Sequence, residues 1–254
     1  MRILVTNDDG LGAKGIELLE RIALTLTSDV TVVAPADEQS GKGRSLTLTA
    51  PLRMRRIDDR HFAVAGTPTD AVIMALGEVM KDSPPDLVLS GINRGANLAE
   101  DVSYSGTVAA AQEAALAGIP AIALSQIYAR RGMGDAVTFE AAEGWGARVL
   151  DKLIGMDWAP RTLVNVNFPP LSVEEVKGIK VVRQGLRDWS QPKLEHGLDP
   201  RGFPYWWMHH GSVPQTPGAD TDLEATAAGY VSVTPLHLDM THDPSKAALE
   251  ARFG

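Results

Sequence analysis

The chain begins MRILVTNDDG over residues 1–10, where an apolar run passes directly into two adjacent carboxylates. The unbroken apolar residues 3–5 predict a strand over residues 2–6 that is buried on both faces, as in a parallel sheet. Asp8 and Asp9 then fall at the carboxyl end of this strand, where open α/β sheets bind their ligands. The first ten residues therefore predict both an α/β fold and the place of a site.

The Asp8–Asp9 pair has two interpretations. Like charges on neighbouring residues repel, and each raises the pKa of the other unless a positive charge, such as a divalent cation, lies between them. The alternative is a solvated turn, because Asn and Asp favour turns through local hydrogen bonds. We favour the metal, because the pair follows a buried first strand and precedes Gly-rich sequence.

The 254-residue chain has the composition of an ordinary globular protein, with 44% hydrophobic and 22% charged residues. Its net charge of −8 argues against a general binder of duplex nucleic acid, which needs a basic face. A small phosphorylated substrate is still compatible with this charge, because a metal supplies positive charge locally. The absence of cysteine excludes disulfides and thiolate metal sites. Without a leader or a long apolar run, we expect a cytoplasmic protein that does not enter membranes.

Apolar strands and amphipathic helices alternate along most of the chain, which predicts a doubly wound, mostly parallel sheet. One helix is expected to begin at Thr67-Pro68, with Thr67 as N-cap and Asp70 in the first turn. Another, opened by a capping box at Thr221 and Glu224, is expected to end at Gly229. The expected buried stripe of the Thr67 helix is Val72, Ile73, Leu76, Val79 and Met80. The other expected helices are 15–26, 105–117 and 138–153, the expected strands are 30–34, 86–90, 121–124, 163–167, 179–183 and 230–235, and short strands or a hairpin are expected within 46–65.

Residues 185–221 are rich in Pro, Gly, Trp and His and have no clear period. A long irregular stretch in a compact domain is improbable unless it is functional or supported by a partner. Its aromatic residues are costly to leave in water, so we interpret it as an arm that packs on another subunit. We therefore expect one domain over 1–254, with a core over about 1–160, and a homodimer or homotetramer. The aromatic residues concerned are Trp189, Tyr205, Trp206 and Trp207.

Small oxygen-bearing side chains end three of the expected strands. A hard cation such as Mg²⁺ or Mn²⁺ prefers these oxygens, whereas Zn²⁺ more usually recruits His or Cys. Each loop alone is a weak signal, since Ser40 and Asn93 are also ordinary turn residues. Their placement at one sheet edge favours a metal site. The residues are Asp8 and Asp9, then Ser40, then Ser90, Asn93 and Asn97.

Ser105-Gly106-Thr107 opens the helix expected over 105–117. Free backbone N–H groups and the helix dipole make such a start a site for phosphate, and Gly106 allows close approach. Taken alone, the segment is better explained by ordinary capping by Ser105. Arg94 and Lys14 are further candidates for holding a phosphoryl group, although such a residue is more often a solvated surface charge.

Six motifs, in this order, resemble the SurE family of stationary-phase survival nucleotidases, which are also described as acid phosphatases. The resemblance implies a Rossmann-like core and a metal-dependent phosphomonoesterase acting on nucleoside monophosphates. It places metal ligands on Asp8, Asp9, Ser40 and Asn93, and it implies dimers or tetramers that rely on C-terminal extensions. The motifs are NDDG at 7–10, APADEQSG at 34–41, GTPTD at 66–70, SGINRGANL at 90–98, YSGTVAAA at 104–111 and GYVSVTPLH at 229–237.

The resulting hypothesis is hydrolysis of a nucleoside 5′- or 3′-monophosphate with one Mg²⁺ or Mn²⁺ per subunit and Asp8 and Asp9 as catalytic residues. A general base is not obvious: Asp9 is one candidate, and His237 is a weaker one that is better explained as structural. One alternative is an aspartyl-phosphate mechanism at Asp8, as in haloacid dehalogenase-like enzymes, but these usually carry Asp-x-Asp. The other is a non-catalytic metal- or nucleotide-binding regulator. The expected phosphate ligands are Asn97, Ser105, Gly106 and Thr107.

Overall fold

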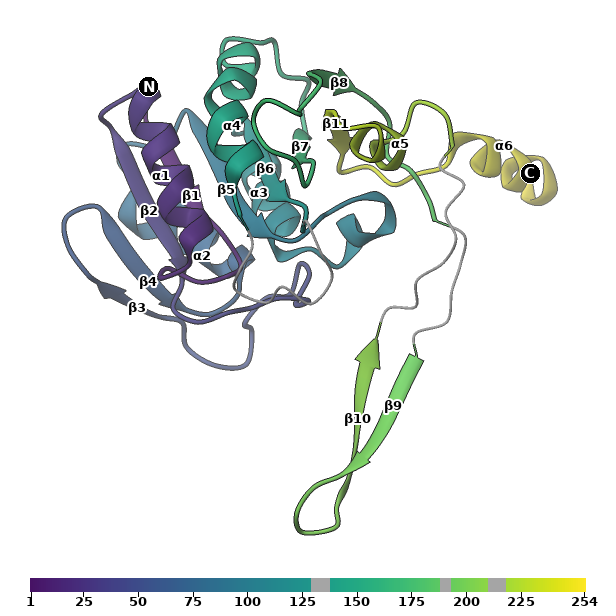
Figure 1. The fold of residues 1–254 in the computed structure, drawn as a ribbon, viewed down its shortest axis with the longest axis horizontal. Coiled ribbons are helices and arrows are strands. Elements are labelled where there is room, and N and C mark those ends of the chain that lie inside the picture. The colour runs from purple at the N-terminus through teal and green to yellow at the C-terminus, as the bar shows by residue number, and fades with distance from the viewer. Residues whose placement is uncertain (129–137, 188–192, 210–217) are drawn as a thin grey trace.

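A nine-stranded sheet with helices on both faces forms the body of the protein in this computed structural model, which describes residues 1–128, 138–187, 193–209 and 218–254 (Figure 1). The strand order is β3-β4-β2-β1-β5-β6-β7-β11-β8. Strand β1 (Ile3–Thr6) pairs in parallel with β2 (Val30–Pro35) and with β5 (Leu87–Arg94). The α/β class and the mostly parallel sheet expected from the sequence are therefore confirmed.

Two pairs of strands in this sheet are antiparallel. At one edge, β3 (Arg53–Arg56) and β4 (His61–Ala65) form the hairpin expected within residues 46–65. Toward the other edge, β11 (Val231–His237) runs antiparallel to β7 (Thr162–Phe168) and parallel to β8 (Ile179–Val181). The carboxyl ends of β1, β2 and β5 consequently lie together along the same side of the sheet, the side on which these strands end, because these central strands all run in the same direction.

The sheet separates two hydrophobic cores. Helices α1 (Lys14–Leu26) and α4 (Glu140–Leu153) pack on one face, where they enclose Ile3 and Val5 of β1. Helices α2 (Pro68–Met74) and α3 (Gly106–Leu116) pack on the other face over Leu4 (Figure 1). The alternation of faces along β1 explains why its apolar run is unbroken. The remaining elements are η1 (Ala75–Val79), η2 (Ala99–Ser103), β6 (Ala121–Gln126), β9 (Lys193–Leu198), β10 (Pro204–His209), α5 (Asp222–Ala227) and α6 (Asp243–Phe253).

Helix α2 begins as expected, because Thr67 and Asp70 form a reciprocal capping box. The expected stripe is partly wrong: Ile73 is 38% exposed, and α2 continues as the π-helical turn η1. A wider turn rotates the following side chains, so that Leu76 and Val79 are only half-buried while Met80 stays in the core. Helix α5 is capped by Thr221 as expected, but the Glu224 carboxylate accepts from the backbone N–H of Asp220 instead of Thr221.

Within the expected arm, β9 and β10 form an antiparallel hairpin that extends away from the body (Figure 1). The prediction that residues 193–209 are irregular is therefore wrong. The connecting turn is held by Asp199, whose carboxylate accepts from the N–H groups of Arg201 and Phe203. Trp189 lies outside the described residues.

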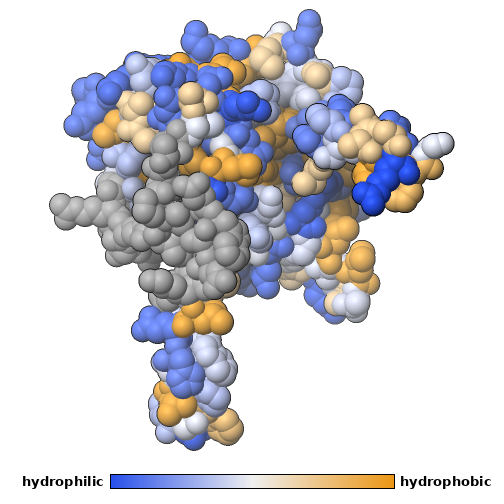
Figure 2. Space-filling model, turned by 90° about the vertical axis from the view of Figure 1, so that its right-hand side faces the viewer, coloured by the Kyte–Doolittle hydropathy of each residue, from blue (hydrophilic) through white to orange (hydrophobic). Residues whose placement is uncertain are grey.

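The hairpin exposes several large apolar side chains (Figure 2). Trp206 is 57% and Trp207 65% exposed in the single chain. The C-terminal helix α6, which was not predicted, is exposed and has no buried residue. Among the described residues, no helix is long and apolar enough to cross a membrane.

Candidate active site

Asp8 follows β1 and is almost fully enclosed, with 4% of its surface exposed. The Thr107 hydroxyl, in the first turn of α3, donates a 2.5 Å hydrogen bond to its Oδ1. Burial raises the pKa of Asp8 to about 6; the Thr107 hydrogen bond opposes this rise, and the neighbouring Asp9 charge adds to it. The site therefore holds a carboxylate whose ionised form lacks full compensation from the protein.

Asp9 lies beside it and is less buried. The backbone N–H of Arg94, the last residue of β5, donates a 3.0 Å hydrogen bond to Asp9 Oδ2. Burial raises the pKa of Asp9, the hydrogen bond and charge of Arg94 lower it, and Glu38 raises it, with a net rise. The two expected ligand loops, after β1 and at the end of β5, are thus joined by a direct contact.

The loop after β2 is attached to the same place, because the backbone N–H of Gln39 donates to the carbonyl oxygen of Asp8 at 2.8 Å. Ser40 is the next residue; it is exposed, and its hydroxyl donates to Glu38 Oε1 at 2.9 Å. Glu38 also pairs with Arg94 at 3.5 Å. Glu38 was missed as a site residue because a lone carboxylate in a polar loop gives no sequence signal.

Asn93 lies where β5 shifts register between Ser90 and Asn93. Its side-chain amide donates to the carbonyl oxygen of Gly95 at 3.0 Å. That bond leaves the amide oxygen as the group with which Asn93 would meet a cation. Ser90 is fully buried, and its hydroxyl has no hydrogen-bond partner in the described part of the chain.

The start of α3 faces the Asp8 carboxylate. Ser105 caps the helix by accepting from the N–H of Val108 at 3.0 Å. A Cβ at Gly106 would lie 2.7 Å from Asp8 Cβ and 2.9 Å from its Oδ2, so the helix start contacts the carboxylate as closely as glycine permits. The ordinary capping role of Ser105 is therefore present, and the Thr107 hydroxyl is engaged by Asp8.

Asn97 is buried and held by polar side chains that the sequence analysis did not single out. Its backbone N–H donates to Asn167 Oδ1 at 2.9 Å, and its carbonyl oxygen accepts from Asn165 at 2.8 Å and from Asn167 at 3.1 Å. Its side-chain amide donates to Ser125 at 2.8 Å. Asn165 and Asn167 alternate on β7 with apolar residues, and this polar period of two is the signal that could have found them.

Two further candidates stand apart from these contacts. His237 pairs with Thr162 at the amino end of β7, whereas the candidate site lies at the carboxyl ends of the parallel strands, on the opposite side of the sheet. Lys14 begins α1 and is exposed, and its side chain forms no hydrogen bond or ion pair with other described residues. His237 is therefore excluded as a general base within this chain.

The chemistry of the donor set fits a hard divalent cation. Asp8 is buried, adjacent to a second carboxylate, and in no ion pair with the described residues. The described residues contain no cluster of three or more His, Cys, Asp and Glu side chains suited to a metal. A cation here would therefore rely on two carboxylates supplemented by hydroxyl, amide or water oxygens, as Mg²⁺ and Mn²⁺ accept.

A family model, curated relatives and a solved structure that resemble this chain all belong to one protein family. Residues 3–191 match a family model described as Survival protein SurE. The chain is 62% identical to a protein of Rhizorhabdus wittichii and 51% identical to one of Erythrobacter litoralis, both named 5′-nucleotidase SurE, with all of each chain covered. A crystal structure of the SurE protein from Aquifex aeolicus superposes with a TM-score of 0.82 at 39% identity over all of both chains.

Proposed function

The chain belongs to the SurE family, and we propose on that premise that it is a metal-dependent 5′-nucleotidase that releases phosphate from nucleoside 5′- or 3′-monophosphates. The phosphomonoesterase activity accords with relatives that are named 5′-nucleotidase SurE and that this chain matches over 91% to 100% of their length. The observation that carries the proposal is the contact between Asp8 and the first turn of α3. It places a candidate metal ligand against a candidate phosphate site.

Asp8, Asp9, Ser40 and Asn93 are the proposed metal ligands. A bound Mg²⁺ or Mn²⁺ supplies positive charge to a phosphoryl oxygen and acidifies water. The contacts of Asp8 with Gln39, and of Asp9 with Arg94, support this set, because each ties a ligand loop to the carboxylate pair. Asp9 is the candidate acceptor for the proton of the attacking water, since it is less enclosed than Asp8.

Asn97, Ser105, Gly106 and Thr107 are the proposed phosphate residues. The N–H groups of Gly106 and Thr107 precede the first intrahelical hydrogen bonds of α3. The Thr107 N–H is directed at Asp8 and lowers the pKa of that carboxyl, so the Gly106 N–H is the backbone donor proposed for an incoming anion. Ser105 accepts from Val108 and keeps its own hydroxyl hydrogen for a phosphate oxygen. The hydroxyl of Thr107 orients Asp8. Asn97 would contact the phosphate from a loop that hydrogen bonds hold in place.

The test is phosphate release from AMP by the purified full chain, with Mg²⁺ or Mn²⁺ added and then removed by chelator. We expect turnover with the metal, loss with chelator, and recovery on adding metal back. Asp151→Asn, an exposed acid on α4, is the matched control for Asp9→Asn. Turnover that persists in chelator would refute the metal, and a phospho-enzyme trapped by acid quench would favour the aspartyl-phosphate alternative.

We also propose that the hairpin of β9 and β10 mediates assembly into a homodimer or homotetramer. An isolated two-stranded hairpin is marginally stable in water, and both faces of this one carry exposed apolar side chains. A second subunit would bury them at low cost by exchanging equivalent arms. The proposal treats residues 1–254 as one functional unit, located in the cytoplasm where nucleoside monophosphates are made.

A further inference from the structure

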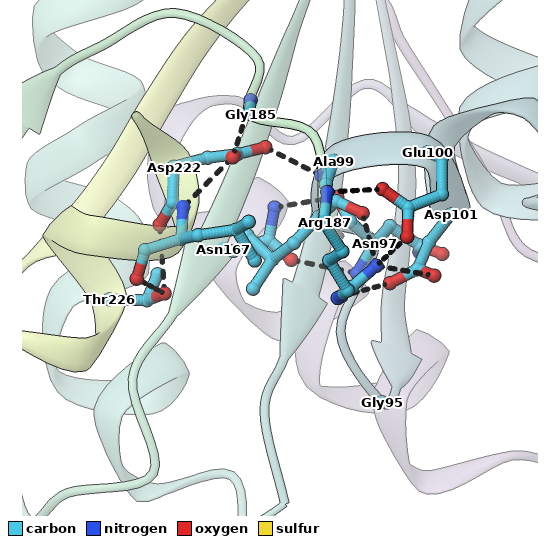
Figure 3. A network of polar contacts seen from close by, with 12 residues as sticks. Gly95, Asn97, Ala99, Glu100, Asp101, Asn167, Gly185, Arg187, Asp222 and Thr226 are labelled. Atoms are coloured by element: carbon cyan, nitrogen blue, oxygen red, sulfur yellow. Dashed lines mark hydrogen bonds and ion pairs between the residues drawn. The ribbon is translucent and has the colours of Figure 1, made fainter. Parts of the chain in front are cut away.

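Arg187 forms a dense set of hydrogen bonds shortly before the β9–β10 hairpin (Figure 3). Its guanidinium donates to Asp101 Oδ1 at 2.9 Å and Oδ2 at 2.7 Å, and to Glu100 Oε1 at 3.1 Å. It also donates to the carbonyl oxygen of Leu98 at 3.3 Å. The side chain is 19% exposed, so this forked, charge-assisted pairing is substantially shielded from water.

Asp101, which binds the Arg187 guanidinium through its side chain, also accepts backbone hydrogen bonds from the residues at the start of α3. The carbonyl oxygen of Asp101 accepts from the backbone N–H of Tyr104 at 2.9 Å and of Ser105 at 3.0 Å. Ser105 is the N-cap of α3, and Gly106 after it abuts Asp8. One residue of η2 thus carries the Arg187 contact on its side chain and the helix cap on its backbone.

Other groups hold the opposite end of η2 without Arg187. Asp222, which begins α5, accepts from the N–H of Ala99 at 2.9 Å and from that of Gly185 at 2.8 Å (Figure 3). The Gln184 side chain donates to the carbonyl oxygen of Ala99 at 2.8 Å. The backbone N–H of Arg187 also donates to Glu100 Oε2 at 3.0 Å, and the N–H of Asp101 donates to the carbonyl oxygen of Leu98 at 3.0 Å. Loss of the Arg187 guanidinium therefore leaves this turn attached to the fold but removes the hydrogen bonds that hold the Asp101 side chain.

Resting on the nucleotidase function proposed above, we propose that Arg187 is a positioning residue that holds the phosphate site at Ser105–Thr107 in place through Asp101. The role is distinct from catalysis, because Arg187 reaches the site only through η2. Arg187 also precedes the β9–β10 hairpin by a few residues. The segment that leads to the hairpin is therefore attached to η2, the turn just before the proposed phosphate site. Substrate affinity therefore depends on how firmly this segment is held.

The experiment compares Arg187→Gln, Arg187→Lys and Asp101→Asn with wild type in steady-state hydrolysis of AMP, alongside inhibition by inorganic phosphate. The matched control is Arg56→Gln, which breaks an exposed Arg–Asp pair on β3. We expect Arg187→Gln to raise the KM for AMP and the Ki for phosphate together, each about tenfold, with a smaller change in kcat. Arg187→Lys should recover part of the loss, because it restores the charge without the fork.

A purely structural role gives a different result: fewer active molecules lower kcat and leave KM and Ki at wild-type values. That outcome, or Arg187→Gln and Asp101→Asn effects that simply add in the double variant, would overturn the positioning role. Should Arg187→Gln fail to fold, Arg187→Lys and Asp101→Asn carry the same comparison. Wild-type protein without AMP turnover would sink the proposed function itself, whereas an active wild type with unchanged variants sinks only this inference.

Discussion

The hydroxyl of Thr107 donates to Oδ1 of Asp8 at 2.5 Å, joining the first turn of α3 to the end of β1 across 99 positions of sequence. The contact fixes one oxygen of the buried carboxylate and leaves the other, Oδ2, beside Gly106. The proposed metal site and the proposed phosphate site, which are far apart in the sequence, therefore meet at one carboxylate in the fold.

Asp8→Asn and Asp9→Asn should each lower turnover of AMP by about a hundredfold or more, because each removes a charge from a site that needs both. The fold should survive. Removing one of two adjacent like charges should raise the free energy of unfolding of the metal-free protein by about 1 kcal/mol. Kinetics and urea unfolding check both effects, with Asp151→Asn as the control. Wild-type rates and metal dependence in both variants would show that the ligand assignment is wrong.

Gly106→Val should abolish phosphate binding. A Cβ at this position meets Asp8 and also lies 3.0 Å from Pro68 Cγ, so a branched side chain displaces the helix start from the carboxylate. Gly77→Ala is the control, since its Cβ would meet nothing within 4 Å. Circular dichroism verifies folding and calorimetry measures binding of inorganic phosphate. A folded Gly106→Val protein with normal affinity contradicts the phosphate site.

His61 should stabilise the protein more at low pH than at high pH. Burial lowers the pKa of His61, but hydrogen bonds and charges from Asp58 and Glu20, each at 2.9 Å, outweigh it and leave the pKa raised. A raised pKa gives stability that is full below the unfolded value of about 6.5 and is lost as pH rises through the folded value. The gap in unfolding free energy between wild type and His61→Gln should narrow from pH 5.5 to pH 8.5. A gap that widens contradicts the linkage.

Asp70→Ala should destabilise the protein by about 2–3 kcal/mol, because three donors lose their shared buried acceptor. These are the N–H of Thr67 at 2.9 Å, the N–H of Thr47 at 3.1 Å and the Thr47 hydroxyl at 2.6 Å. Denaturant unfolding measures the effect, and the exposed Asp82→Ala is the control. Equal stability of the two variants would show that the capping box contributes nothing.

Trp206→Ser combined with Trp207→Ser should shift the protein toward smaller species, because it removes the largest apolar surface of the hairpin. Leu24→Ser, an exposed apolar residue on α1, is the control. Light scattering across a dilution series gives the mass. A wild-type chain that is monomeric at every concentration refutes the arm, and leaves the active-site proposal standing.

The parallel sheet, its two cores and the candidate ligand loops were predictable because their signals are local. An apolar run, a capping residue such as Thr67, and an Asp pair after a strand can each be recognised from a few neighbouring residues. The hairpin was missed because exposed apolar strands around Gly202 do not show the alternation of a half-buried sheet.

The supports of the site were missed for a different reason. Arg187, Asn165 and Asn167 matter through partners about 70 to 90 residues away, and a single sequence does not show such pairs. Leu76 and Val79 were misplaced because the π-helical turn after α2 shifts the helical period, and nothing in the local sequence predicts such a turn. Ile73 lies before this turn and was misplaced because it falls beside the buried stripe of Ala71, Val72 and Ala75.

The loop of Asn97 leaves the ribosome well before the groups that hold it. Asn165 and Asn167 follow by 68 and 70 residues, and Asp222 follows Ala99 by 123. At about 5–20 residues per second, several seconds of synthesis separate the loop from its last anchor. A nascent chain halted before β7 thus contains every proposed metal ligand but lacks the hydrogen bonds that hold the loop of Asn97, so we expect the proposed phosphate site to be ordered only after β7 has been made.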